Sequence, residues 1–211
     1  MSRRSSITMW LLRAGDTEWD EADRLRGDEE LPMSNGGLAA TTEAFERASA
    51  MTFPPPGRIH HPLDPAASET ARLAARTIGG RPKGNDDLAD PALGVLAGLS
   101  LPELRDRFER RARQWEEDPS ELVPPEGEPF PDARRRLVGT VASILKRRPE
   151  TVGLVLHELA AGFVRAALSG AVQGNPRRWM DGRPRVEVWV LPPDAAIRLR
   201  NAQQEMVETP A

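Results

Sequence analysis

The stretch TVGLVLHELAAGFVRAALSGAV, residues 151–172, contains the clearest strand of the chain followed directly by a helix. Its first part, residues 151–157, is a run of leucine and β-branched residues that predicts a buried strand ending at His157. A helix rich in small residues is expected over residues 158–172. Strands that alternate with helices are typical of a mostly parallel sheet. The stretch therefore predicts an α/β fold.

The same alternation occurs toward the N-terminus. Residues 7–13, ITMWLLR, predict a buried strand, and Ser34 is placed to cap a helix over residues 36–50. The segment RIHHPL predicts a second strand that ends at Pro62, and residues 64–80 predict a helix ending on glycines. Helices between successive strands lead us to expect a parallel sheet that is covered on both faces.

The middle of the chain is more polar. Residues 81–87, RPKGNDD, are expected to form a turn, and residues 101–118 a single charged amphipathic helix. Residues 132–149 predict a strongly amphipathic helix. Its inner stripe is Leu137, Val141, Ile144 and Leu145.

Two alternating segments near the C-terminus, RVEVWVL at 185–191 and AAIRLR at 195–200, are expected to be antiparallel edge strands or a hairpin joined by PPD. The proline-rich stretches FPPPG and PPEGEPFP are interpreted as loops over the sheet and not as interdomain linkers. One domain over residues 1–211 is therefore expected.

Composition excludes several classes of function. The chain has 211 residues, a net charge of −3 and no cysteine, which excludes disulfides, thiolate metal sites and thiol catalysis. Its basic runs are interleaved with acidic residues, so nucleic-acid binding is not expected. The apolar run near the N-terminus is too short for a membrane span or a secretion signal. We expect a cytoplasmic protein that does not bind membranes.

Polar residues follow the predicted strands at their carboxyl ends, where ligands bind in open α/β sheets. These residues are Arg13, His60, His61, Asp90 and His157, and they include all three histidines of the chain.

The pair His60–His61 has two interpretations. Adjacent strand residues point to opposite faces, so one histidine is expected to cap the strand end and the other to pack under a helix. The alternative is a relocated nucleophile or a metal site with His157, for which a carboxylate such as Asp90 would be a further ligand. No metal or cofactor is expected on the first interpretation.

The segment LLRAGDTEWDEADRLRGDEELPMSNGG, residues 11–37, resembles the opening signature LVRHGETEWN…RLQG…PLSEKG of the histidine phosphatase superfamily. The resemblance extends over residues 7–190 and implies a three-layer α/β/α sandwich of the phosphoglycerate mutase type. Four further blocks carry it: HHPLDPAASETARLAA, DDLADPALGVLAGLSLPEL, PPEGEPFPDARRRL and VGLVLHELAAGFVRAALSG.

The resemblance implies phosphoryl transfer through a phosphohistidine, without a metal or other cofactor. In the family, the histidine of R-H-G attacks the phosphoryl group. Two arginines and a later histidine hold the charge of the phosphate, and an acidic residue protonates the leaving oxygen.

Transferred position by position, much of this machinery is missing. Arg13 matches the first arginine, but Ala14 stands at the position of the nucleophile. Asp20 stands where a phosphate-binding asparagine is common, and Pro65 where the second arginine is expected. Asp90 falls on the acid and is one methylene shorter than the usual glutamate.

Of the remaining positions, some match the family's residues and others do not. His157 matches the second histidine, but Glu158 replaces a glycine whose backbone lies close to the phosphate in the family. Ala97 replaces the glutamate of the family's WEG motif. His61 lies in the HHPL block and is a candidate binding residue. Loss of a nucleophile costs on the order of 10⁶ in rate.

The leading interpretation is a pseudophosphatase that binds a small phosphorylated ligand or a partner protein. The alternative is an active phosphatase or phosphomutase-like enzyme for small phosphorylated metabolites. It would use His157 or His61, or its natural sequence would carry histidine where Ala14 is an engineered replacement. A third possibility is a structural domain with a filled pocket. The edge strand RVEVWVL is a candidate homodimer contact.

Overall fold

A computed structural model describes residues 6–147, 149–171, 175–180 and 182–208, with side chains up to residue 203. Its centre is a five-stranded sheet with the order β3-β2-β4-β1-β5. The strands are β1 (Ile7–Arg13), β2 (Arg58–His61), β3 (Arg81–Gly84), β4 (Thr151–Leu156) and β5 (Val186–Leu191). Only β5 among them runs antiparallel to its neighbour. The predicted mostly parallel sheet with an antiparallel edge is confirmed.

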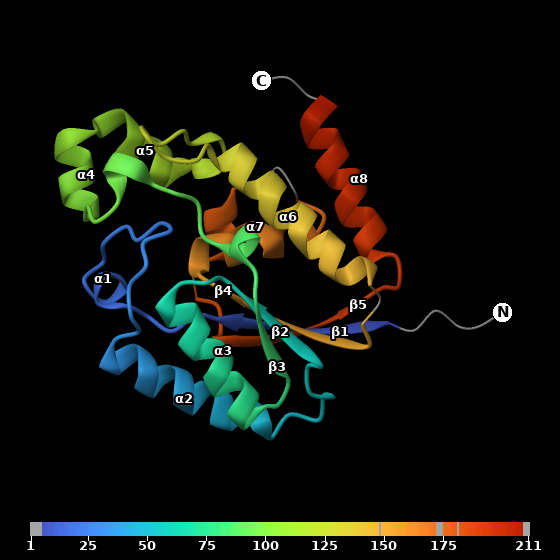
Figure 1. Ribbon diagram of the computed structural model, residues 1–211. Helices are drawn as coiled ribbons and strands as arrows, with labels where there is room; N and C mark the ends of the chain where they lie inside the picture. The colour runs from blue at the N-terminus through green and yellow to red at the C-terminus, as the bar shows by residue number, and fades with distance from the viewer. Residues whose placement is uncertain (1–5, 148, 172–174, 181, 209–211) are drawn as a thin grey trace.

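Helices cover both faces of the sheet (Figure 1). On one face lie α2 (Asn35–Ser49) and α3 (Pro65–Thr77); on the other lie α6 (Phe130–Lys146), α7 (Glu158–Leu168) and α8 (Ala195–Glu208). Alternation along β1 separates the two cores, because Trp10 and Leu12 are buried with α2 and α3 whereas Met9 and Leu11 are buried with α6–α8. The predicted three-layer α/β/α sandwich is confirmed.

Shorter elements lie over the carboxyl ends of the strands, on the left in Figure 1. They include the helices α1 (Glu18–Glu21), α4 (Leu101–Arg107) and α5 (Glu109–Glu117). Four 3₁₀ turns complete the described chain: Asp86–Leu88, Gly94–Leu96, Pro119–Glu121 and Pro176–Trp179. None of the helices in the described part of the chain is both long and apolar enough to cross a membrane.

Polar side chains cap the N-termini of the helices that follow β1 and β2. The hydroxyl of Ser34 accepts a hydrogen bond of 2.8 Å from the Gly37 amide, which confirms the predicted cap of α2. Asp64 caps α3 in the same way through the Ala67 amide, and Pro65 occupies the first turn, where its missing N–H costs nothing.

Three predicted elements are wrong. Residues 195–200 belong to helix α8 and not to a strand. Ala195, Ala196 and Leu199 pack into the core at helical spacing, whereas Ile197, which an alternating strand would place on the same face as Leu199, is exposed. Residues 81–84 form edge strand β3 and not a turn. The helix predicted over 101–118 is two helices, since Phe108 breaks it with a backbone conformation of φ −140° and ψ 54°.

The other predicted helices differ from the observed ones only at their ends. The helix expected over 132–149 runs from Phe130 to Lys146, and its predicted inner stripe is buried. The helix expected over 158–172 ends at Leu168. Residues 148 and 172, which lay at the predicted ends, are outside the described residues.

Candidate functional site

The carboxyl ends of β1 and β4 bring the family-type residues together. The two strands are parallel with Arg13 opposite Leu156, so the loop after β1 lies beside the start of α7. The guanidinium of Arg13 lies between two carboxylates: its Nη2 is 3.1 Å from Asp16 Oδ1, and its Nε is 2.9 Å from Glu158 Oε2. The cation that the resemblance assigns to phosphate binding is therefore paired within the protein.

This pairing extends into a chain of alternating charges. Glu158 Oε1 also lies 3.3 Å from Nη1 of Arg165, a fully buried arginine of α7 whose Nε is 2.8 Å from Glu187. At the other end, Asp16 pairs with Arg185. Burial raises the pKa of Glu158, and the neighbouring guanidinium groups oppose that rise.

Ala14 lies where the resemblance places the nucleophile, and it is packed as a core residue. It is buried with α2 and α3, and its amide donates a hydrogen bond of 2.9 Å to the Leu156 carbonyl. The next amide, that of Gly15, donates to the Thr70 hydroxyl of α3. The loop backbone is thus firmly held, while the position that would react carries only a methyl group.

His157 follows β4 and is held by a partner that the sequence analysis did not single out. Its Nε2 lies 3.0 Å from Asp64 Oδ1, and both side chains are buried. Burial alone would raise the pKa of Asp64. The hydrogen bond and charge of His157, with the Ala67 amide, lower that pKa below its ordinary value. Asp64 thus caps α3 and orients His157 at once.

Asp90 is buried beneath the same end of the sheet. One carboxylate oxygen lies 2.9 Å from Nη2 of the buried Arg26, and the other accepts a hydrogen bond of 2.8 Å from the Ala160 amide of α7. Burial raises the pKa of Asp90, although Arg26 and His157 act in the opposite direction. Arg26 was not predicted as a site residue, although its place in the RLRG segment of the signature could have identified it.

Among the described residues, no side-chain hydrogen bond or ion pair joins the other predicted residues to Arg13, Asp90 or His157. The carboxylate of Asp20 turns back to its own helix and accepts hydrogen bonds of 2.7 Å from the amide and the hydroxyl of Thr17. Pro65 is exposed in the first turn of α3, and Ala97 packs at the edge of the core. His61 is buried, with Nδ1 2.7 Å from the neighbouring Pro62 carbonyl. Their assigned roles stay predictions.

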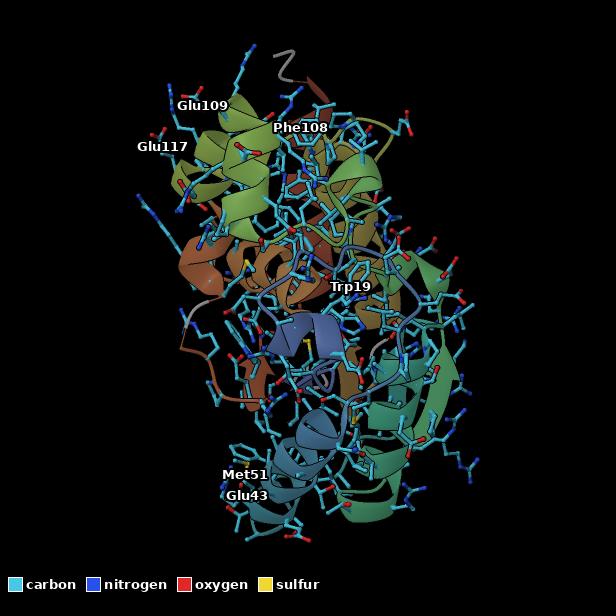
Figure 2. The ribbon with its side chains drawn as sticks, turned by 90° about the vertical axis from the view of Figure 1, so that its left-hand side faces the viewer. Trp19, Glu43, Met51, Phe108, Glu109 and Glu117 are labelled. Carbon is cyan, nitrogen blue, oxygen red and sulfur yellow. The ribbon has the colours of Figure 1, made fainter. Side chains whose placement is uncertain are left out.

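Figure 2 looks onto this end of the sheet, where Trp19 lies below Phe108 of the α4–α5 junction in this view. The Trp19 ring covers Gly98, whose backbone has a φ of +77°. A Cβ at that glycine would lie 2.9 Å from the ring, so the close approach requires glycine here.

A cavity of about 200 Å³ lies beside Asp64 and Asp90. Five of its lining residues carry carboxylates, and a single arginine faces them. The lining is Arg26, Asp28, Glu30, Pro62, Leu63, Asp64, Asp86, Ala89 and Asp90. Within the described residues, no three histidine or acidic side chains are arranged to hold a metal ion. A phosphate dianion would meet an acidic surface in this cavity.

The two adjacent histidines lie on opposite faces of β2. His60 faces α6 and lines a separate groove together with Lys83 and Arg147. Its Nδ1 is buried and has no hydrogen-bond partner among the described residues. The two histidines therefore do not meet in one pocket with His157.

Comparison with known proteins identifies relatives over most of the chain. The probable phosphoglycerate mutase GpmB of Cronobacter sakazakii is 25% identical over 178 residues, which are 82% of this chain and 79% of that protein. The protein of the same name from Escherichia fergusonii is 26% identical over 181 residues.

Solved structures share the fold. The Bacillus stearothermophilus protein YhfR superimposes with a TM-score of 0.74 at 22% identity, covering 86% of this chain and 90% of that one. A mycobacterial glucosyl-3-phosphoglycerate phosphatase superimposes with a TM-score of 0.70 at 23% identity, covering 82% and 84%. Residues 9–188 match the histidine phosphatase superfamily, branch 1. The chain therefore belongs to the histidine phosphatase superfamily.

Proposed function

We propose that this chain is a superfamily member without phosphohistidine-dependent catalysis, and that it acts by binding a partner. The observation that carries the proposal is the pairing of Arg13 with carboxylates of its own chain. Its guanidinium is held by Asp16 and Glu158, while the adjacent Ala14 has no nucleophilic atom. A phosphoryl group would find neither an acceptor nor a free cation at this position.

The size of these two losses supports an inactive site. Removing a catalytic nucleophile costs on the order of 10⁶ in rate. A hydrogen bond to a charged group contributes about 1.5–3 kcal/mol, and Arg13 already makes such contacts with carboxylates of its own chain. A phosphate would have to displace Glu158, which is also held by Arg165.

The acidic lining of the cavity beside Asp64 and Asp90 indicates which kind of partner would bind there. Five carboxylates disfavour a small phosphorylated ligand there and favour a protein partner that presents a basic side chain. The expected test is a titration with orthovanadate, in which we expect no saturable binding that depends on Arg13. Tight binding that Arg13→Ala abolishes would contradict this part of the proposal.

The alternative is an active phosphohydrolase, and one contact favours it. The buried Asp64–His157 pair has the geometry of a histidine oriented by a carboxylate. The names of the relatives also point to phosphatases and mutases. In this arrangement, however, His157 Nε2 faces Asp64 and not an open space where a phosphoryl group could sit.

Turnover of p-nitrophenyl phosphate and small sugar phosphates separates the two functions. We expect no turnover by the unmodified protein or by Ala14→His, because Asp16 and Glu158 still hold Arg13. The double variant Ala14→His with Glu158→Gly leaves Arg13 with Asp16 as its only carboxylate partner, and it is expected to give the first measurable turnover. Ala39→His, the same replacement at an exposed position of α2, is the matched control.

Each contrary result is informative. Turnover by the unmodified protein would overturn the inactive assignment. Turnover by Ala14→His alone would show that Glu158 does not block the site, and it would favour a recent or engineered loss at position 14.

A further inference from the structure

A second charged region lies on β2 and β3, away from the residues discussed above. These strands are parallel, with Arg58 opposite Arg81 and His60 opposite Lys83. Paired residues of adjacent strands point to the same face, so these four side chains form two rows on the α6 side of the sheet. Among the described residues, no ion pair or side-chain hydrogen bond involves the three cations of these rows.

Helix α6 supplies the opposite wall. Arg147 follows the last residue of this helix, is exposed and likewise has no side-chain partner within the described part of the chain. Two adjoining cavities of about 690 and 910 Å³ share His60, Lys83, Ile144 and Arg147. Together they form one groove along the β3 edge, which we call the β3 groove. Each of the two cavities has a volume in the range of small-molecule sites.

His60 lies at the floor of the β3 groove. Its side chain is 7% exposed, yet Nδ1 makes no hydrogen bond with any described residue. Burial first, and then Lys83, Arg58 and Arg147 in that order, lower the pKa of His60 from its ordinary value of 6.5 to about 4. The imidazole is therefore neutral at pH 7, with a donor or acceptor that nothing in the described chain satisfies.

Charge in the groove is strongly positive, although the whole chain carries −3. Six cations line the two cavities, namely Arg58, Arg81, Lys83, Arg135, Arg136 and Arg147. Three acids face them: Asp87, Asp132 and Glu150. Arg135 is already paired with Asp132, and Arg136 with Glu128 outside the groove. Four cations around His60 are left for a ligand.

We propose that the β3 groove binds a small polyanion built of linked phosphate groups, either free oligophosphate or the phosphate tail of a nucleotide. Cations spaced about 5 Å across the strands and roughly 7 Å along them match several anionic groups better than one. Neither cavity has Phe, Trp or Tyr in its lining, so phosphates and not a stacked base are the recognised part. The ligand would also supply the missing partner of His60.

This proposal does not depend on whether the chain is catalytic. The β3 groove includes Arg58, Arg81 and Thr151 at the amino ends of their strands, whereas Arg13 and His157 lie at the carboxyl ends. Loss of binding in the β3 groove and recovery of turnover at Ala14 are therefore measured independently.

Calorimetric titration at low salt with tripolyphosphate, ATP and AMP tests the proposal. We expect saturable binding of tripolyphosphate and ATP at one site, and AMP binding at least tenfold weaker. Tighter binding of ATP than of tripolyphosphate would identify a nucleotide as the source of the phosphates, and equal or weaker binding would identify free oligophosphate. Lys83→Ala and Arg147→Ala should each weaken binding about tenfold, as expected for loss of one charge-assisted contact.

Two controls separate a built site from diffuse attraction. Lys146→Ala removes the same charge from the residue next to Arg147, outside both cavities, and should change affinity less than twofold. Arg72→Ala, at an exposed arginine of α3 outside both cavities, should likewise leave binding unchanged. Equal losses in Lys146→Ala and Lys83→Ala, or no saturable binding by the unmodified protein, would overturn the proposal.

The ring of His60 provides a readout that a purely structural role would not give. Tripolyphosphate should shift its ¹⁵N resonances and raise its pKa, and His60→Gln should lose these signals while staying folded by thermal unfolding. His60 resonances that do not respond to saturating tripolyphosphate would contradict the proposed site.

Discussion

The two charged regions of this protein differ in whether their cations are paired with carboxylates. At the carboxyl ends of the strands, Arg13, Arg26, Arg165 and Arg185 are each paired with carboxylates of the same chain. In the β3 groove, by contrast, Arg58, Arg81, Lys83 and Arg147 face one another without such partners among the described residues.

Burial explains part of this difference. Arg26 and Arg165 are almost fully buried, and a buried charge is tolerated only when an opposite charge and hydrogen bonds compensate for its lost hydration. The four cations of the groove are exposed, so leaving them unpaired costs little. The charges of the family-type site are therefore balanced by residues of the same chain, whereas the four cations of the groove have no such partner among the described residues.

The largest expected effect is at Arg165. Arg165→Met should lower the free energy of unfolding by about 3–5 kcal/mol, because it removes the counter-charge of Glu187 and leaves Glu158 with Arg13 alone. Urea unfolding measures the change. The double variant with Glu187→Gln should recover part of the loss. A loss below about 1 kcal/mol would show that the paired region is not held by its charges.

A smaller effect is expected from acid titration of His60. Its pKa in the folded protein, about 4, is below the ordinary value of 6.5, so the unfolded chain binds the proton more readily between these pH values. Stability is therefore complete above pH 6.5 and falls as pH decreases toward 4, by about 3 kcal/mol from this group.

His60→Gln isolates this contribution, because Asp64, Asp90 and Glu158 titrate in both proteins. The difference in unfolding free energy between the unmodified protein and the variant should change with pH over this window. Saturating tripolyphosphate should reduce the change. A pH-independent difference would contradict the lowering of the pKa of His60 by its burial and by Lys83, Arg58 and Arg147.

The smallest effect is expected at the exposed cations. Lys83→Met and Arg81→Met should each change the free energy of unfolding by less than about 0.5 kcal/mol, since these side chains have no partner to lose. Chemical denaturation with Arg165→Met as the reference measures the contrast. A loss of more than about 1 kcal/mol at Lys83 would mean that the groove cations support the fold.

The sequence predicted the central elements because their patterns are strong and local. The β-branched run before His157 and the capping position of Ser34 both define elements without help from distant residues. Strand β3 has no such pattern, because it is exposed and contains Pro82; it is a strand only because β2 lies beside it. Helix α8 was missed because a segment of six residues is too short to distinguish the helical period of 3.6 residues from the strand period of 2.

The candidate site was predictable only in part. Arg13, Ala14, His157 and Glu158 come together at the ends of adjacent parallel strands, as the resemblance implied. Several pairings in the site join residues that are far apart in the sequence: Asp64 is 93 residues from His157, and Arg26 is 64 residues from Asp90. No local pattern reports such pairs.

By itself, the amino-acid sequence determined the layered α/β architecture, the family resemblance and the absence of a nucleophile at position 14, since each depends on local periodicity or residue identity. Only the tertiary structure decided which charges are neutralised and which remain available. The reason is physical: pairing and desolvation depend on distances between segments remote in sequence, and strand register sets those distances.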